Sequence, residues 1–240
     1  MSTAEELERH AAAARAARQA IQEQDELVHR RMQQAANFFG EFAKQMNVIA
    51  PRARQVMDLP GVMRFAELVI RDLFVEERMR QAYDPSATIS GSAQVRYEYL
   101  LLSYHYFGPR RHTLVRDLAP EIERLEDQLS MNRIRYEVKL LRNARAQVER
   151  ASFHVESNIA AGVKFIPDYD QGRVRIALRN IDRLATWEVT IAASELSQPL
   201  FEELAKCVLG HANEFRRLAL GDHRSGAATT PRAPPLGPNY

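Results

Sequence analysis

The sequence predicts an α+β protein in which a long N-terminal helix precedes a domain of antiparallel strands and covering helices. Three observations lead to this class. Residues 4–46 contain no proline and one glycine, and the strong helix formers alanine, glutamate, glutamine and arginine dominate them. Several runs within residues 95–191 alternate apolar and polar side chains, as strands with one covered face do. Residues 198–209 have apolar side chains at helical spacing and stop at Gly210, a residue typical of helix C-termini.

The second half of the long helix carries an apolar seam with alternating steps of four and three residues. Its members are Val28, Met32, Ala35, Phe39, Phe42 and Met46. This spacing is typical of a supercoiled helix and predicts a surface that needs a partner. Further upstream, Arg18 and Asp25 interrupt the same register with charge. We interpret residues 1–47 as an oligomerising coiled coil that pairs with itself or with another coiled-coil protein; the alternative is a helix folded back on its own domain.

Residues 48–61 contain two prolines and a glycine and are predicted to link the helix to a domain spanning residues 62–220. The stretch 62–83 fits either an amphipathic helix or two strands that turn near Asp72, and the helix is the preferred interpretation. Residues 84–92 are predicted to form a loop. Residues 221–240 are rich in proline and glycine with few apolar side chains, which predicts a disordered tail.

Within the domain, a strand is predicted from Val95 through Phe107, where Gly108 and Pro109 should end it before a second strand begins. Asp117 is the expected N-cap of a helix that buries one face. That face consists of Leu118, Ile122, Leu125 and Leu129. Alternation resumes over residues 134–140 and again at Phe153 and Val155, although residues 144–151 also fit a helix.

The last third of the domain predicts a three-stranded antiparallel meander covered by a helix. The inward residues of the strands are Val163 and Phe165, then Val174, Ile176 and Leu178, then Trp187, Val189 and Ile191. Ser197 is the expected N-cap of the covering helix.

The segment Asp168–Gly172, DYDQG, lies between two of these strands and has acids at an interval that suggests a calcium loop. An EF-hand loop needs an acid at its fifth position and glutamate at its twelfth, but these positions hold Gly172 and Arg179. The segment therefore predicts a hairpin turn with glycine in a left-handed conformation. The histidines show no zinc spacing with one another, so no metal or cofactor site is predicted.

No glycine-rich phosphate loop follows a predicted strand, and no Gly-x-Ser-x-Gly nucleophile motif is present. The single cysteine, Cys207, falls on an apolar helical face, where packing is a better interpretation than nucleophilic catalysis. We therefore expect a protein that is not an enzyme. An enzyme of unrecognised type remains the second alternative.

Arginines provide the candidate binding patch, because Arg173, Arg175 and Arg179 share the polar face of one predicted strand. Such a patch can bind an anion or an acidic partner, and it supports the first alternative, a nucleic-acid-associated protein. The favoured interpretation is a solvated sheet face in which arginines pair with Glu188 or Asp182. A group of nearby aromatic residues can stack bases but fits better as core. These residues are Tyr97, Tyr99, Tyr104, Tyr106 and Phe107.

The net charge of +2 is too small to require a strongly charged partner. A lone cysteine fits a reducing compartment, the N-terminal residues lack the apolar core of a secretory signal, and no stretch is long and apolar enough to span a bilayer. We expect a soluble, cytoplasmic, non-catalytic scaffold or adaptor without a membrane partner, present as a homo-oligomer or complex subunit.

Overall fold

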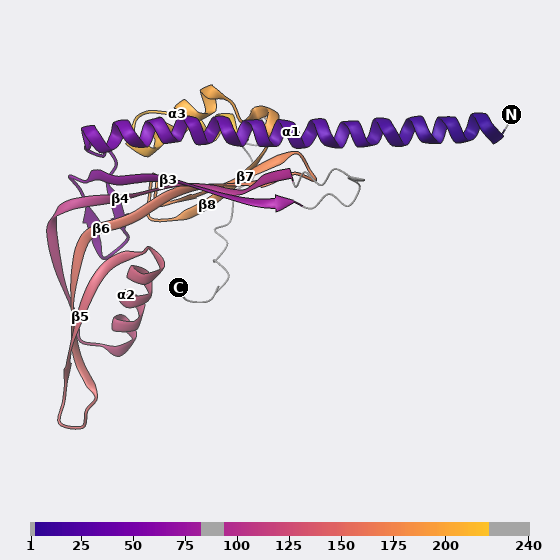
Figure 1. Cartoon of the computed structure of the whole chain (residues 1–240). Coiled ribbons are helices and arrows are strands. Elements are labelled where there is room, and N and C mark those ends of the chain that lie inside the picture. Colours follow the sequence, from indigo (N-terminus) through magenta and orange to yellow (C-terminus); the bar gives the residue numbers. More distant parts are fainter. Residues whose placement is uncertain (1–2, 83–93, 221–240) are drawn as a thin grey trace.

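A single long helix lies across a twisted antiparallel sheet in the computed structural model, which describes residues 3–82 and 94–220 (Figure 1). This arrangement confirms the α+β class. Helix α1 spans Thr3–Ile49, and α3 (Gln198–Leu209) lies on the same side of the sheet. The loop predicted at residues 84–92 and the tail predicted at 221–240 lie outside the described residues.

The main sheet has six strands, all paired antiparallel, in the order β3-β4-β6-β7-β8, with β5 added beside β6. The strands are β3 (Val69–Ala82), β4 (Gln94–Arg116), β5 (Ile134–Arg142), β6 (Val148–Asp168), β7 (Arg173–Arg179) and β8 (Thr186–Ala192). A separate two-stranded hairpin is formed by β1 (Met57–Leu59) and β2 (Met63–Phe65). The meander predicted from alternation is confirmed as β6, β7 and β8.

Strands β4 and β6 are 23 and 21 residues long and belong to two parts of the sheet. At one end they pair with β3 and β7, and at the other end β6 pairs with β5 instead. Figure 1 shows the two strands bending between these parts, with α2 (Ala119–Met131) beside β5. The long strands thus connect a lower α2–β5 unit to the sheet under α1.

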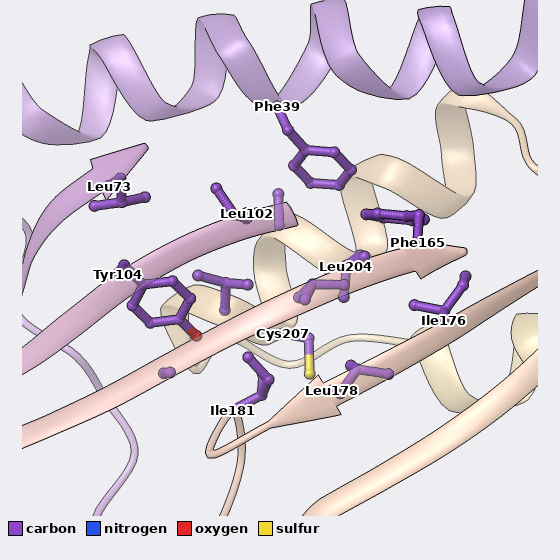
Figure 2. Close-up of a cluster of buried hydrophobic side chains, with 14 of the residues drawn as sticks. Phe39, Leu73, Leu102, Tyr104, Phe165, Ile176, Leu178, Ile181, Leu204 and Cys207 are labelled. Atoms are coloured by element: carbon purple, nitrogen blue, oxygen red, sulfur yellow. The ribbon is translucent and has the colours of Figure 1, made fainter. Parts of the chain in front are cut away.

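The core of the upper part lies between α1, α3 and one face of the sheet (Figure 2). Phe39 of α1 is fully buried, with its ring centroid 5.5 Å from that of Phe165 and 5.7 Å from that of Phe201. On the same side, α4 (Phe215–Leu220) contacts β8, where the centroids of Phe215 and Trp187 are 5.9 Å apart. All three helices therefore cover one face of the upper sheet.

The preferred interpretation of residues 62–83 as a helix is wrong, because the described part of this stretch contains β2 and β3. The expected turn near Asp72 is a β-bulge between Arg71 and Phe74, and Asp72 has a φ of 57°. The bulge lets β3 continue as one strand. Its apolar residues face the core at every second position, apart from the extra residue at the bulge, and do not follow a helical spacing.

Two boundaries in the next segment are also corrected. Gly108 and Pro109 do not end the strand: β4 continues through them, with a bulge between Phe107 and Arg111. Asp117 does not cap α2, whose N-cap is Leu118 without a side-chain cap; Asp117 pairs with Arg150 instead. Leu118, expected on the buried face, is 61% exposed. The other members of that face, Ile122, Leu125 and Leu129, are buried as predicted.

The remaining local predictions agree with the structure except at residues 144–151, where a turn and the start of β6 replace the possible helix. The DYDQG segment is a hairpin turn between β6 and β7, with Gly172 at a φ of 61°. Helix α3 ends at Gly210, whose φ of 71° is the expected left-handed C-terminal conformation. Ser197 occupies the N-cap position, although its side chain makes no capping hydrogen bond.

Candidate functional site

The apolar seam of α1 is occupied within this chain. Its six residues, Val28, Met32, Ala35, Phe39, Phe42 and Met46, are all buried in the core. They pack against the sheet and α3, so the seam is not a free surface for a second helix. Residues 28–46 therefore follow the alternative interpretation, in which the helix folds back on its own domain.

The docked part of α1 ends at a polar anchor. Asp25 is buried and forms an ion pair with Arg96 on β4, and the Arg96 guanidinium lies 4.9 Å from the ring centroid of Tyr169. One residue earlier, the Gln24 amide donates to the backbone oxygens of Tyr169, at 2.6 Å, and Asp170, at 3.1 Å. The charge that interrupts the seam at position 25 therefore holds the helix to β4, and Gln24 holds it to the β6–β7 turn.

Upstream of this anchor, α1 projects beyond the sheet (Figure 1). All residues from Glu8 to Glu23 are exposed, and Ile21 is 62% exposed. These 16 residues would extend for about 24 Å at 1.5 Å per residue. Residues 8–23 of α1 thus form a helical segment that the rest of the described domain leaves uncovered.

The second face of the upper sheet is the other candidate surface, and we call it the open face. Alternation along the paired strands places on it Phe74, Tyr99, Leu101, Ser103, His105, Phe107, Ile166, Lys164, Arg175 and Arg179. In contrast to the helix-covered face, these side chains are exposed or half-buried, and Phe74 is 52% exposed. The open face therefore combines aromatic and apolar side chains on β3 and β4 with cations on β6 and β7. Strand β3 also contributes Glu76, which accepts a hydrogen bond from the Tyr99 hydroxyl, and Arg78, which lies against the Tyr99 ring.

The aromatic residues of β4 divide between the two faces. Tyr97, Tyr104 and Tyr106 are buried in the core, as expected, whereas Tyr99 and Phe107 lie on the open face. Tyr97 and Tyr99 point to opposite faces despite their spacing of two because the register shifts opposite Arg78 and Met79. A bulge, which the alternation pattern does not reveal, thus brings an aromatic ring to the open face.

The cations on the open face differ in their partners. The Lys164 ammonium lies 4.0 Å from the ring centroid of Tyr99, and Arg175 pairs with Glu188 at 3.1 Å. The predicted pairing with Asp182 is not formed by the arginine patch, because Asp182 pairs with Arg216. Arg179 is half-buried between Gly162 and Thr186 on the adjacent strands, and burial together with the charge of Arg133 lowers the pKa of its guanidinium.

A depression of about 430 Å³ lies where the open face approaches the bend of β4. Its lining includes Arg52, Arg71 and Phe107, together with Glu67. Arg71 and His105 are paired residues, and the His105 and Phe107 rings stack with centroids 5.7 Å apart. Basic side chains therefore occur near Phe107 at this end of the open face, in addition to Lys164 and Arg175.

The Tyr106 hydroxyl and the Cys207 thiol are buried in the core. The Tyr106 hydroxyl donates to the backbone oxygens of Ile181, at 3.0 Å, and Val208, at 3.2 Å, and accepts from Gln55. Burial raises the pKa of Cys207 to about 11, so its thiol is protonated near neutral pH. Within residues 3–82 and 94–220, no group of three or more histidine, cysteine or acidic side chains is arranged to hold a metal ion.

In the part of the chain that the structure describes, no helix has the length and apolar character needed to cross a membrane.

Comparison of the chain with known proteins gave no match. No protein-family model matches the chain, and no curated protein or solved structure is detectably similar to it.

Proposed function

We propose that this chain is a non-catalytic adaptor that uses its projecting helix, Glu8–Glu23, to bind a second copy of itself or another helical protein. The observation that carries the proposal is the complete exposure of this segment beyond the Asp25 anchor. An isolated helix of this length is marginal in water, but this segment continues a helix already fixed by its docked half. The domain thereby pre-forms a binding helix and lowers the entropy that association costs.

The projecting helix offers a narrow apolar strip that suits a helical partner. Ala14 and Ile21 continue the seven-residue spacing of the docked seam, and alanine allows close approach of a second helix. Arg18 interrupts this strip between Ala14 and Ile21, and Arg15 flanks it; both supply charges that can select a partner and its orientation.

The proposal is tested by Ala14→Glu and Ile21→Glu in the full chain, with Gln19→Glu as an exposed control that adds the same charge. Light scattering after gel filtration measures self-association over a range of protein concentrations, and affinity capture followed by mass spectrometry measures partner recovery. We expect the Ala14 and Ile21 variants, but not the control, to lose association while keeping the thermal stability of the parent. A monomer at every concentration with identical captured proteins in all variants would contradict the proposal.

A second candidate function, binding of single-stranded nucleic acid, is supported by the interleaved rings and cations of the open face. On the open face of β4, Leu101 and Ser103 separate Tyr99 from the stacked His105 and Phe107, and the stretch from Tyr99 to Phe107 extends for about 27 Å at 3.4 Å per residue. Sheet surfaces that bind single strands combine aromatic rings, on which bases stack, with cations that follow the phosphates, and their smallest sites hold about four nucleotides. Lys164 against Tyr99 and Arg175 on the neighbouring strand have this arrangement.

Fluorescence anisotropy with labelled oligo(dT) and oligo(U) of eight nucleotides tests this candidate. We expect binding that weakens with added salt and is reduced by Tyr99→Ala and by Lys164→Met. Lys139→Met, a charge-matched change on an exposed residue of β5, should leave binding unchanged. Equal losses in the Lys164 and Lys139 variants would show non-specific attraction and reject the open face as the site.

A further inference from the structure

We propose that Arg133 and Arg179 together form a binding site for one phosphoryl group at the β5–β7 border of the open face. The site would accept a free phosphate compound or a backbone phosphate of a nucleic-acid strand, because both present the same oxygens. The inference deepens the second candidate function and is independent of the projecting helix.

The first argument is the position of Arg179 in the sheet. It lies on β7 between Gly162 of β6 and Thr186 of β8, and it is half-buried. Neither Arg179 nor Arg133 forms an ion pair with any carboxylate in the described residues.

Three carboxylates on or next to β6, β7 and β8 form ion pairs with other arginines. Glu188 pairs with Arg175 at 3.1 Å, and Asp182 pairs with Arg216 at 2.7 Å. Glu156 lies 3.5 Å from both Arg111 and Arg135. The positive charge of the Arg133–Arg179 pair is therefore left uncompensated by its neighbours, which makes an anion from outside favourable.

The second argument is the backbone that brings the two arginines together. The buried Asn180 side chain donates to the backbone oxygens of Asn132, at 3.0 Å, and Ala160, at 2.9 Å. These bonds tie the residue before Arg133 to the residue after Arg179. Both Arg133 and Asn180 have left-handed conformations, with φ of 51° and 52°.

Non-glycine residues in this conformation cost free energy and persist where the surrounding structure holds them in place. Here residues on both sides of one hydrogen-bonded contact adopt this conformation, and the contact brings the backbone of Arg133 near that of Arg179. Burial of Arg179 and the proximity of Arg133 disfavour the charged form of Arg179. A phosphoryl group would reverse this penalty, since guanidinium groups bind phosphate oxygens in paired, charge-assisted hydrogen bonds.

Isothermal titration calorimetry of the full chain with sodium pyrophosphate, and separately with oligo(dT) of eight nucleotides, tests the site. Arg133→Met and Arg179→Met should each weaken pyrophosphate binding about tenfold or more, the effect of losing a charge-assisted hydrogen bond. Arg179→Lys should give a smaller loss because it keeps the charge without the planar fork. Arg145→Met, an exposed arginine of the β5–β6 turn, is the matched control and should bind as the parent does.

Arg133 is exposed, so its variant is expected to fold and carries the test if the Arg179 variant does not. Binding of both probes, with competition between them, would assign the site to a nucleic-acid phosphate. Binding of pyrophosphate alone would assign it to a small phosphate compound and would argue against the second candidate function. Absence of pyrophosphate binding, or equal binding by the Arg133, Arg179 and Arg145 variants, would overturn the proposal.

Discussion

Truncation of Phe39 to alanine measures how strongly the chain holds its own helix. Phe39 is fully buried, and its ring has four aromatic neighbours with centroids between 5.0 and 6.4 Å away: Phe38, Phe42, Phe165 and Phe201. Replacing a buried phenylalanine by alanine costs about 3–5 kcal/mol, and aromatic pairs add about 0.5–1.5 kcal/mol each beyond area burial. We therefore expect Phe39→Ala to lower the free energy of unfolding by about 4–5 kcal/mol.

The assay is equilibrium urea unfolding followed by circular dichroism at several protein concentrations. Ile21→Ala is the matched control, because it also truncates a large apolar side chain of α1 but lies in the exposed segment; its effect should stay within about 0.5 kcal/mol. A loss below about 1 kcal/mol for Phe39→Ala would refute the docked seam. A cost that appears only at high protein concentration would place Phe39 in a contact between chains and would also refute it.

Three further predictions concern the anchor, a glycine and the buried thiol. Asp25→Ala should cost about 2 kcal/mol in urea unfolding, because it leaves a half-buried guanidinium without its carboxylate. Gly210→Ala should destabilise more than Gly61→Ala: both glycines have a φ of 71°, which costs an alanine about 1 kcal/mol, but at Gly210 the added methyl group also collides with Gln55. Burial raises the pKa of Cys207 to about 11 from an ordinary value of 9.0, so the folded chain holds this proton more tightly than the unfolded chain. The stability contributed by the thiol is then complete below pH 9 and lost as the pH rises toward 11; Cys207→Ala should flatten this part of the stability profile, and an unchanged slope would contradict it.

Much of the fold was predictable because local patterns and tertiary structure agree. The alternation in β7 and β8 and the glycine after α3 each match the observed element. The prediction for residues 62–83 failed because Val69, Ile70 and Leu73 have a helical spacing. The bulge at Arg71–Phe74 allows these residues to lie in a strand, and the local sequence pattern does not predict the bulge. Similarly, Gly108 and Pro109 lie in the irregular region where β4 bends, so residues that usually end a strand are accommodated within it.

The candidate surfaces were predictable in part. The sequence identifies the seam residues. However, a seam that packs against its own domain and a seam that pairs with another chain have the same periodicity. It also identifies Arg175 and its pairing with Glu188. Arg133 could not be placed beside Arg179, because the contact depends on hydrogen bonds of Asn180 to segments distant in sequence.

The order in which the chain is made gives the docked seam a further consequence. Val28 to Met46 leave the ribosome before the surfaces that cover them, which include Phe165 and Phe201. At a synthesis rate of 5–20 residues per second, the interval between Met46 and Phe201 is roughly 8–30 s. During that time the nascent chain exposes an amphipathic helix without its sheet, a form that chaperones recognise and that invites premature pairing between neighbouring chains on one messenger RNA. The early helix is therefore the part of this protein most dependent on protection during translation.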